Sequence, residues 1–453
     1  MSSVLEILDD LPFLQLFIAF QILVTIFHLY LDFRQLHVLK SPKPPPVLAE
    51  HFNQDLYLKT QAYSLDKWYF GFWRGMYSLF ESMIMLTYKV LPWIWMYSAI
   101  LLHKHLPEPA LAWLNAGSPV PGASRRFELA QTTVFVMILL ASNMVTGLPW
   151  SLYSTFVIEE KHGFNKQTIG LFFTDMIKSV LLGSVMVPPI VVGITYILQI
   201  GGAWLALYLW GFMLALSLFF MTIYPTVIAP LFNKFETLPE GSLRSKIEQL
   251  ASGLKFPLKK LFKVDGSKRS AHSNAYMYGF WKNKRIVLYD TLLNHCSEEQ
   301  VVAVLAHELG HWKLGHTPVL FTVNQFVMLF SFSLFTFIRN SQGLLDSFGF
   351  SGMGQPAFIS MVLFQFISSP LDEVIQFCQN LVSRTFEFQA DGFAVSQGVG
   401  GHLREALLKL EEENKSAMNV DPLYSSFHYS HPPLAERLKA IDVGVSEQKK
   451  KDS

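Results

Sequence analysis

Long uncharged apolar segments constrain this chain more than any other feature. Five such segments occur among its 453 residues, and each is long enough to cross a bilayer as a helix. Two weaker candidates, Ser78–Leu102 and Pro356–Val382, include charged residues. The sequence therefore predicts an α-helical integral membrane protein with seven transmembrane helices. The five clear segments are Leu11–Leu31, Leu129–Leu148, Ser179–Ile200, Trp204–Ile228 and Pro318–Ile338.

Composition supports a membrane protein and excludes several other classes. The chain is 51% hydrophobic and 16% charged, whereas soluble domains are about 25% charged. A net charge of +1 gives no indication of a nucleic-acid partner. The two cysteines, Cys296 and Cys378, cannot form a disulfide framework. The first apolar segment lacks a basic region before it and a small-residue cleavage site after it, so we expect a membrane anchor and not a cleaved signal.

The distribution of basic residues predicts the orientation in the membrane. Seven spans place alternate connecting segments on opposite sides, and one side then carries 31 of the 36 lysines and arginines while the other carries 4. Cytosolic loops are the ones enriched in lysine and arginine. We therefore expect segments 32–77, 149–178 and 229–317 and the tail from residue 383 to be cytosolic.

The polar segments predict a soluble region interrupted by the last two spans. We expect transmembrane helices 1–5 in residues 1–230, a cytosolic soluble segment in 231–316, transmembrane helices 6–7 in 317–382 and a cytosolic C-terminal segment in 383–453. Hydrophobic spacing favours soluble helices and two short strands, and the basic end at Lys449–Lys451 is expected to be disordered. The expected helices are Glu240–Leu254, Ser297–Leu314, Arg384–Ala394 and Leu403–Glu412, followed by a segment through Pro422–Leu438, and the strands are Lys260–Asp265 and Arg285–Tyr289.

One short motif in this soluble region carries a recognisable chemistry. His307, Glu308 and His311 form H-E-x-x-H within an apolar stretch expected to be helical. On a helix, residues four apart share a face, so both imidazoles can reach one metal ion with Glu308 beside it. This arrangement is typical of zinc metalloproteases, in which the glutamate is the general base. Two solvated histidines on a surface helix would give the same pattern.

A hydrolytic zinc site needs a third protein ligand, and the pattern leaves several candidates. Glu387 is favoured, because Asp391 shares its helix face and could accept the free N–H of a ligating histidine. A solvated amphipathic helix is the alternative. His316 is out of step with the extended metzincin spacing and is expected at the start of the sixth span. The intramembrane pair Asp372–Glu373 is a further rival, since buried membrane carboxylates are often functional.

Two more polar clusters could complete an active site. Residues 421–437 are rich in tyrosine, serine and histidine, and one such donor could stabilise an oxyanion. A proline-bounded turn before a helix explains the same residues. The loop Gly266–Tyr276 lies between the two expected strands, where an edge strand could pair with an extended peptide. As a plain connection it needs no function.

Taken together, these residues resemble the type I CAAX prenyl proteases, integral-membrane zinc endopeptidases of the endoplasmic reticulum and inner nuclear membrane. The resemblance covers nearly the whole chain and rests on five separated motifs in order. Five motifs and seven spans are far more specific than H-E-x-x-H alone. The motifs are Pro149–Asn165, Asp265–Leu292, Val304–His316, Ser383–Asp391 and His428–Leu438.

The resemblance implies a role for each candidate. It implies one Zn²⁺ per chain, held by His307, His311 and Glu387, with Asp391 supporting a ligand. It places His431 near the oxyanion and Arg437 beside the site, and it assigns Asn274 and Ala275 to the strand that binds substrate backbone. It also implies that the transmembrane helices form a barrel around a water-filled chamber, with the zinc site at its cytosolic end.

The resemblance also implies the substrate and the location. Members of the family remove the last three residues from farnesylated CAAX proteins such as prelamin A or a-factor, and some make a second, upstream cut. We accordingly expect a multi-pass protein of the endoplasmic reticulum membrane, with the active-site motif and the C-terminus in the cytosol. The ending Lys450-Lys451-Asp452-Ser453 resembles a dilysine retrieval signal, although a basic solvated tail would look the same.

Two other functions remain open from the sequence. One is a general quality-control protease acting on misfolded or translocon-clogging membrane proteins. The other is a non-enzymatic scaffold or channel with a structural zinc site. Glu308 argues against the second, because zinc binding alone does not need it.

Overall fold

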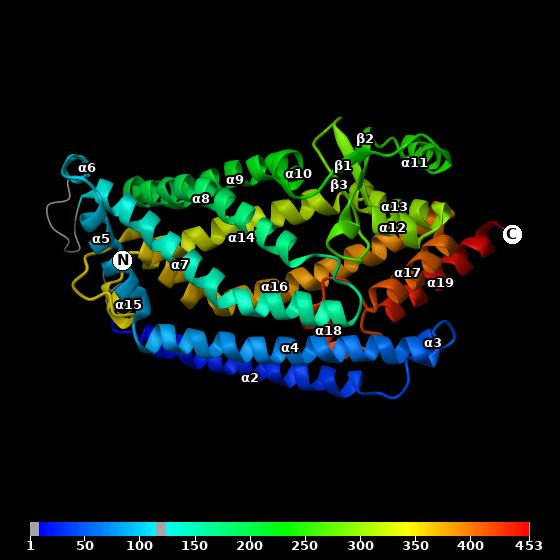
Figure 1. Cartoon of the computed structure of the whole chain (residues 1–453), viewed down its shortest axis with the longest axis horizontal. Helices are drawn as coiled ribbons and strands as arrows, with labels where there is room; N and C mark the ends of the chain where they lie inside the picture. Colours follow the sequence, from blue (N-terminus) through cyan, green and yellow to red (C-terminus); the bar gives the residue numbers. More distant parts are fainter. Residues whose placement is uncertain (1–8, 115–123, 453) are drawn as a thin grey trace.

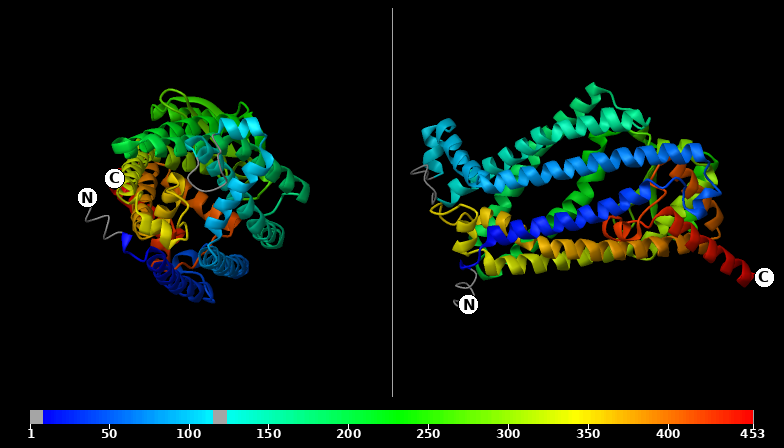
Figure 2. Two further views of the ribbon diagram at one scale, coloured as in Figure 1. Left: turned by 90° about the vertical axis from the view of Figure 1, so that its left-hand side faces the viewer. Right: turned by 90° about the horizontal axis from the view of Figure 1, so that it is seen from below.

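The computed structural model describes residues 9–114 and 124–452. Long helices run along its longest axis, and the strands and shorter soluble helices gather at the end that carries the C-terminus (Figure 1). Seen along that axis, the long helices lie around a common centre (Figure 2, left). Neighbouring pairs are α2 with α4, α7 with α8, and α9 with α14. The chamber that the resemblance implies stays a prediction.

Six helical stretches in the described residues are long and apolar enough to span a membrane, and a bent pair raises the number to seven. The prediction of seven spans is therefore confirmed by length and composition. Most spans extend beyond the apolar segment that predicted them, because the helix continues into the more polar residues on one or both sides. The six stretches are α2 (Phe13–Leu39), Arg125–Glu159, α8 (Ile169–Ile200), Gly202–Phe232, α14 (His316–Ile338) and α16 (Ala357–Ser396).

The second predicted span, Ser78–Leu102, is wrong as a single helix. The structure has α4 (Gln54–Thr87) and α5 (Val90–His105), bent by 66°. Lys89 adopts a left-handed backbone conformation, with φ of 51°, which breaks the helix. Because α4 begins 24 residues before the predicted start, Lys59, Lys67 and Arg74 lie on this helix and not in a loop. When these three residues are left out, the lysines and arginines of the predicted cytosolic segments still greatly outnumber those of the other side.

The last span also differs from the prediction. Residues 384–394 were expected to form a separate helix, but α16 is continuous over 40 residues and carries Glu387 and Asp391 near its end. The membrane helix itself therefore delivers these carboxylates to the soluble region. On the other side of the site, the short connection Leu314–Gly315 joins the motif helix α13 (Glu298–Lys313) directly to the membrane helix α14.

Four short strands form the soluble sheet, in the order β1-β2-β4-β3. Strands β2 and β4 are parallel, whereas β1 and β3 pair antiparallel at the two edges. The two predicted strands correspond to β2 and β4. The loop expected between them contains the edge strand β3. The strands are β1 (Phe235–Thr237), β2 (Leu258–Val264), β3 (Ala275–Tyr278) and β4 (Lys284–Tyr289).

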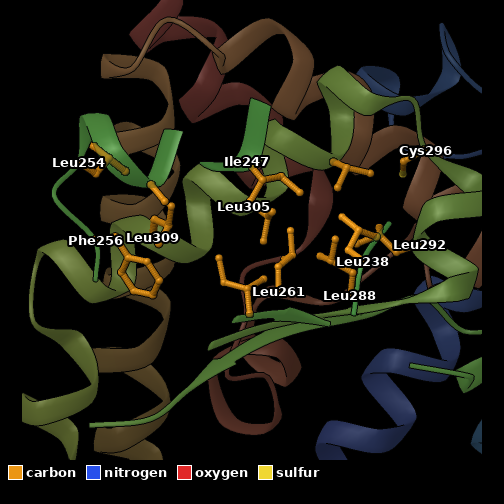
Figure 3. Close-up of a cluster of buried hydrophobic side chains, with 13 residues drawn as sticks. Leu238, Ile247, Leu254, Phe256, Leu261, Leu288, Leu292, Cys296, Leu305 and Leu309 are labelled. Atoms are coloured by element: carbon orange, nitrogen blue, oxygen red, sulfur yellow. The ribbon is translucent and has the colours of Figure 1, made fainter. Parts of the chain in front are cut away.

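A compact apolar core fixes the motif helix on this sheet. Ile247 from α11 (Ser242–Gly253), Leu261 from β2 and Leu288 from β4 meet Leu305 and Leu309 of α13 (Figure 3). Every one of these side chains is at most 3% exposed. At its start, α13 has a reciprocal capping box between Ser297 and Gln300. One face of α13 is thereby anchored, and the opposite face is free to carry chemistry.

The C-terminal helix and the other helices of the chain complete the fold. At the C-terminus the predicted disorder of Lys449–Lys451 is wrong, because these residues continue α19 to Asp452. Ser453, the last residue of the dilysine-like ending, lies outside the described residues. The other α-helices are α3 (Pro46–Ala49), α6 (Glu108–Trp113), α7 (Arg125–Tyr153), α9 (Leu205–Ile223), α10 (Ala229–Phe232), α12 (Asp290–His295), α15 (Gln342–Ser347), α17 (Gly400–Asn414), α18 (Pro422–His428) and α19 (Leu434–Asp452). Short 3-10 or π segments are η1 (Ser154–Glu159), η2 (Gly202–Trp204), η3 (Tyr224–Ile228) and η4 (Gly266–Lys268).

Candidate metal centre

The motif helix α13 and the end of α16 lie side by side where the soluble region meets the membrane helices (Figure 1). Gly310 allows this close approach. A methyl group at Gly310 would lie 3.1 Å from the Phe393 ring and 3.3 Å from the Ala390 backbone. These distances are tighter than ordinary van der Waals contact. A glycine one residue before His311 therefore lets the two helices bring their polar faces together.

Three predicted ligands converge across this contact. His307 Nε2 and His311 Nε2 lie 3.2 Å apart. The Glu387 carboxylate approaches them, with Oε2 3.5 Å from His307 Nε2 and Oε1 3.3 Å from His311 Nε2. One ligand atom from each residue fits within 4.8 Å of the others, and among the described residues this is the one such group of three metal-ligating side chains. The structure thus brings together the three residues that the sequence singled out.

Asp391 and Arg437 hold the buried side of this cluster. Asp391 Oδ1 lies 2.8 Å from His307 Nδ1, on the far side of the ring from Glu387. The Arg437 guanidinium, from α19, donates to both Asp391 oxygens at 2.9 and 2.7 Å. A carboxylate in this position fixes the orientation of a ligating imidazole and leaves Nε2 free to bind. Both residues lie where the resemblance implied.

His316 has a partner that sequence reasoning missed. It opens α14, as expected, and its Nδ1 lies 2.9 Å from His311 Nδ1, while its Nε2 lies 2.9 Å from Gln389 Oε1. The His316 ring also stacks on Phe386 at 4.1 Å. His316 therefore orients His311 much as Asp391 orients His307. In the sequence, only the position of His316 just beyond the motif could have suggested its contact with His311.

The rival carboxylates lie elsewhere. Glu373 contacts His28 of α2 at 3.3 Å, and Asp372 accepts a hydrogen bond from Ser368 in its own helix. Neither belongs to the group of three metal-ligating residues. Their positions are explained by contacts inside the membrane part of the molecule.

Two buried groups of the motif on α13, Glu308 and His307, have shifted pKa values. Burial raises the pKa of the Glu308 carboxyl above its ordinary value, because a low-dielectric surrounding disfavours the charged form. For His307, burial alone would lower the pKa, but the hydrogen bond to Asp391 and the nearby Glu387 carboxylate outweigh it and raise the pKa to about 9. The carboxylates around His307 thus create a site that favours positive charge.

A cavity of about 240 Å³ opens over the cluster. Glu308 lines it beside the two histidines, and so do Ala275, the first residue of the edge strand β3, and Asn274 directly before it. His431 also lines it, with Nε2 3.3 Å from Glu387 Oε1 and 66% of its side chain exposed. Every predicted site residue therefore lies at or directly behind one cavity. A second cavity, of about 900 Å³, shares His431, Arg437 and Ser273 with the first.

Comparisons with known proteins agree with this arrangement. Residues 35–234 match the family described as the CAAX prenyl protease N-terminal region with five membrane helices, and residues 237–444 match peptidase family M48. The crystal structure of Ste24p from S. mikatae superposes with a TM-score of 0.86 at 38% sequence identity, over 96% of this chain and 99% of that one.

Named relatives give the same result over full length. CAAX prenyl protease 1 homolog from Arabidopsis thaliana is 52% identical, covering 98% of this chain and 100% of the relative. The Homo sapiens protein of the same name is 40% identical, covering 92% and 93%. Fold, catalytic motif and sequence similarity together show that this chain is a membrane metallopeptidase and belongs to the M48 family of type I CAAX prenyl proteases.

Proposed function

We propose that the chain is a zinc-dependent endopeptidase that removes the C-terminal tripeptide from prenylated CAAX proteins. The observation that carries the proposal is the convergence of His307, His311 and Glu387 beside Glu308 in one cavity. The names of the relatives support the substrate class. Members of this family that make a second, upstream cut would use the same site.

The donor set fits zinc. Two imidazole nitrogens and one carboxylate oxygen are the protein ligands of many catalytic zinc sites. Glu387 Oε2 is buried and has no hydrogen-bond partner among the described residues. A bound cation would satisfy this oxygen, whose burial otherwise costs free energy. We infer one Zn²⁺ per chain, which when bound polarises the scissile carbonyl and lowers the pKa of its water toward ~7.

Side chains and backbone of the protein carry out proton transfer, oxyanion stabilisation and substrate binding. Glu308 accepts the proton of the attacking water and later passes it to the leaving amine. His431, exposed to the cavity, donates a hydrogen bond to the oxyanion. Ala275 begins, and Asn274 directly precedes, an edge strand whose free side pairs with substrate backbone. Asp391, Arg437 and His316 hold the ligands in place.

We also propose a location in the endoplasmic reticulum membrane with the active site on the cytosolic face. The excess of basic residues on that side supports this orientation. The cavity at the end of the membrane helices would let the prenyl chain stay in an apolar surrounding while the peptide reaches water.

The test is hydrolysis of a farnesylated CAAX peptide by the purified full chain in detergent. We expect release of the C-terminal tripeptide, loss of activity with a chelator, recovery with zinc, and no activity in Glu308→Gln although zinc remains bound. An unprenylated peptide is the matched control. Equal cleavage of both peptides would overturn the substrate class and favour a general membrane-protein protease. Cleavage of neither peptide by a zinc-loaded wild type would overturn the proposal.

A further inference from the structure

The strand that is proposed to bind substrate is preceded by a segment outside the sheet. Residues 269–273 lead into β3 and lack sheet partners, so other elements must fix their position. The Ala271 amide donates to Phe164 O at 3.0 Å, and the Lys166 amide donates to Arg269 O at 3.1 Å. An isolated bridge also joins Asn165 to Ser270. This segment is therefore bound to the loop that follows the membrane helices α7 and η1.

His272 is the centre of these contacts. Its ring stacks on Phe164, with 4.2 Å between ring centroids and 15° between planes. Nε2 lies 3.4 Å from Glu159 Oε2, at the end of η1. The other Glu159 oxygen accepts a hydrogen bond of 2.7 Å from Tyr63 OH of α4. One side of the imidazole is therefore tied to two membrane helices.

The other side of the ring faces the soluble helix α17. His272 Nδ1 lies 3.3 Å from Asn414 Oδ1, the last residue of that helix. The same oxygen accepts the Ser273 backbone N–H at 3.3 Å, which fixes the orientation of the Asn414 amide. Both neighbours of the ring, Glu159 and Asn414, therefore present acceptors.

The position of His272 in the chain gives these contacts a consequence for the active site. Ser273 and Asn274 follow directly, and both line the cavity over the metal ligands. The His272 carbonyl accepts a hydrogen bond of 3.0 Å from Thr291 Oγ1, which holds the backbone at the same point. A displacement of His272 would shift the start of β3 against α13, whereas the ligands are held by separate contacts to Asp391 and His316.

We propose that His272, held between Glu159 and Asn414, is a positioning residue that sets the register of the substrate-binding strand β3 relative to the metal site. The proposal rests on the proposed function for the role of β3 in binding peptide. In this view the membrane helices α4 and η1 hold the chain at His272, three residues before the substrate strand begins at Ala275. His272 touches neither the metal ligands nor the reacting atoms.

The first test separates substrate binding from the chemical step. In the full chain in detergent, we expect His272→Ala to raise KM for an extended farnesylated peptide about tenfold, with kcat within about threefold of wild type and unchanged zinc content. The KM of His272→Gln should lie between those of wild type and His272→Ala, because the glutamine side chain retains an N–H donor. His402→Ala, at a solvent-facing histidine of α17, should behave as wild type. A fall in kcat together with loss of zinc, or an unchanged KM, would overturn the proposal.

A second test asks whether Glu159 acts through His272. Glu159→Gln should raise KM in the same direction, and the double variant Glu159→Gln/His272→Ala should be no more than about threefold worse than the worse single variant. If the two substitutions raised KM independently, so that their effects multiplied in the double variant, the result would contradict a coupling between Glu159 and His272.

A third test does not depend on activity, so that it separates this proposal from the proposed function. Amide hydrogen exchange of residues 273–278 should become faster in His272→Ala, while exchange of α13 stays the same. Unchanged exchange would overturn the positioning role even in an active enzyme. An inactive wild type with the expected exchange would overturn the proposed function alone.

Discussion

Helices α2 and α13 satisfy their apolar side chains in different ways. In α2 only 6% of the most apolar window is buried within the molecule, whereas α13 buries seven of its sixteen residues, His307 among them. Lipid is the partner for most of α2, and the protein core is the partner for α13. The exposed positions of α2 should therefore tolerate change in size, while small shifts around α13 move the metal ligands.

The largest expected effect contrasts two carboxylates on the same helix. Glu387→Ala should remove zinc and lower kcat/KM roughly a thousandfold or more, because a ligand and its charge are lost. Glu373→Ala, fourteen residues earlier in the membrane part of α16, should keep zinc and most of the activity. Metal content and peptide hydrolysis are measured on both. Equal losses would show that the two halves of α16 are not distinct.

Core truncation should separate the two regions by stability. Leu305 is 0% exposed, and Leu305→Ala should cost about 2–5 kcal/mol, because it leaves a cavity in the core of Figure 3. Leu23 of α2 is 64% exposed, and Leu23→Ala should cost less than about 1 kcal/mol. Equilibrium unfolding in detergent measures both. A similar cost at Leu23 would reveal a packed partner for α2.

Added methyl groups should have unequal effects on the two regions. Gly310→Ala inserts a Cβ between α13 and α16 and should cost about 1–3 kcal/mol of stability and weaken zinc binding. Gly183 of α8 has nothing within 4 Å of the added Cβ, so Gly183→Ala should be neutral or slightly stabilising. Unfolding and zinc titration measure the pair. Normal zinc affinity in Gly310→Ala would mean that the helix contact does not set the site.

The smallest expected effect is the pH dependence of zinc binding. With the His307 pKa at about 9, a proton on this ring competes with zinc at neutral pH. Apparent zinc affinity should therefore rise up to about tenfold per pH unit as pH increases toward 9, with proton release on binding. Calorimetry in buffers of different ionisation enthalpy measures the released protons. No proton release at pH 7 would contradict the raised pKa.

Sequence reasoning predicted the spans well because continuous apolarity reports a lipid surrounding. The prediction failed at Lys89, where a single residue in the left-handed conformation bends the chain. No local sequence pattern indicated this break in the helix. The prediction also divided α16 after Val382, because the apolar run ends there and a polar segment follows, although the helix continues to Ser396. Apolarity reports the surroundings of a segment but not where its helix stops.

The candidate site shows a similar limit. The spacing of His307 and His311 predicted a shared helix face directly. The pattern alone left Glu387 open among rivals, and family resemblance favoured it before the structure placed it beside the histidines. The partner of His311 was missed, because the contact with His316 depends on the turn at Gly315 between α13 and α14. Contacts between elements need the packing, which one sequence does not contain.

The most direct test of the account is a crystal structure of the full chain with zinc, with anomalous scattering measured on both sides of the zinc absorption edge. The account predicts one zinc per chain, bound by His307, His311 and Glu387, with its remaining coordination position open to the cavity that Glu308 lines. Zinc bound elsewhere, or closed off by a fourth protein ligand, would contradict a hydrolytic centre built by α13 and α16.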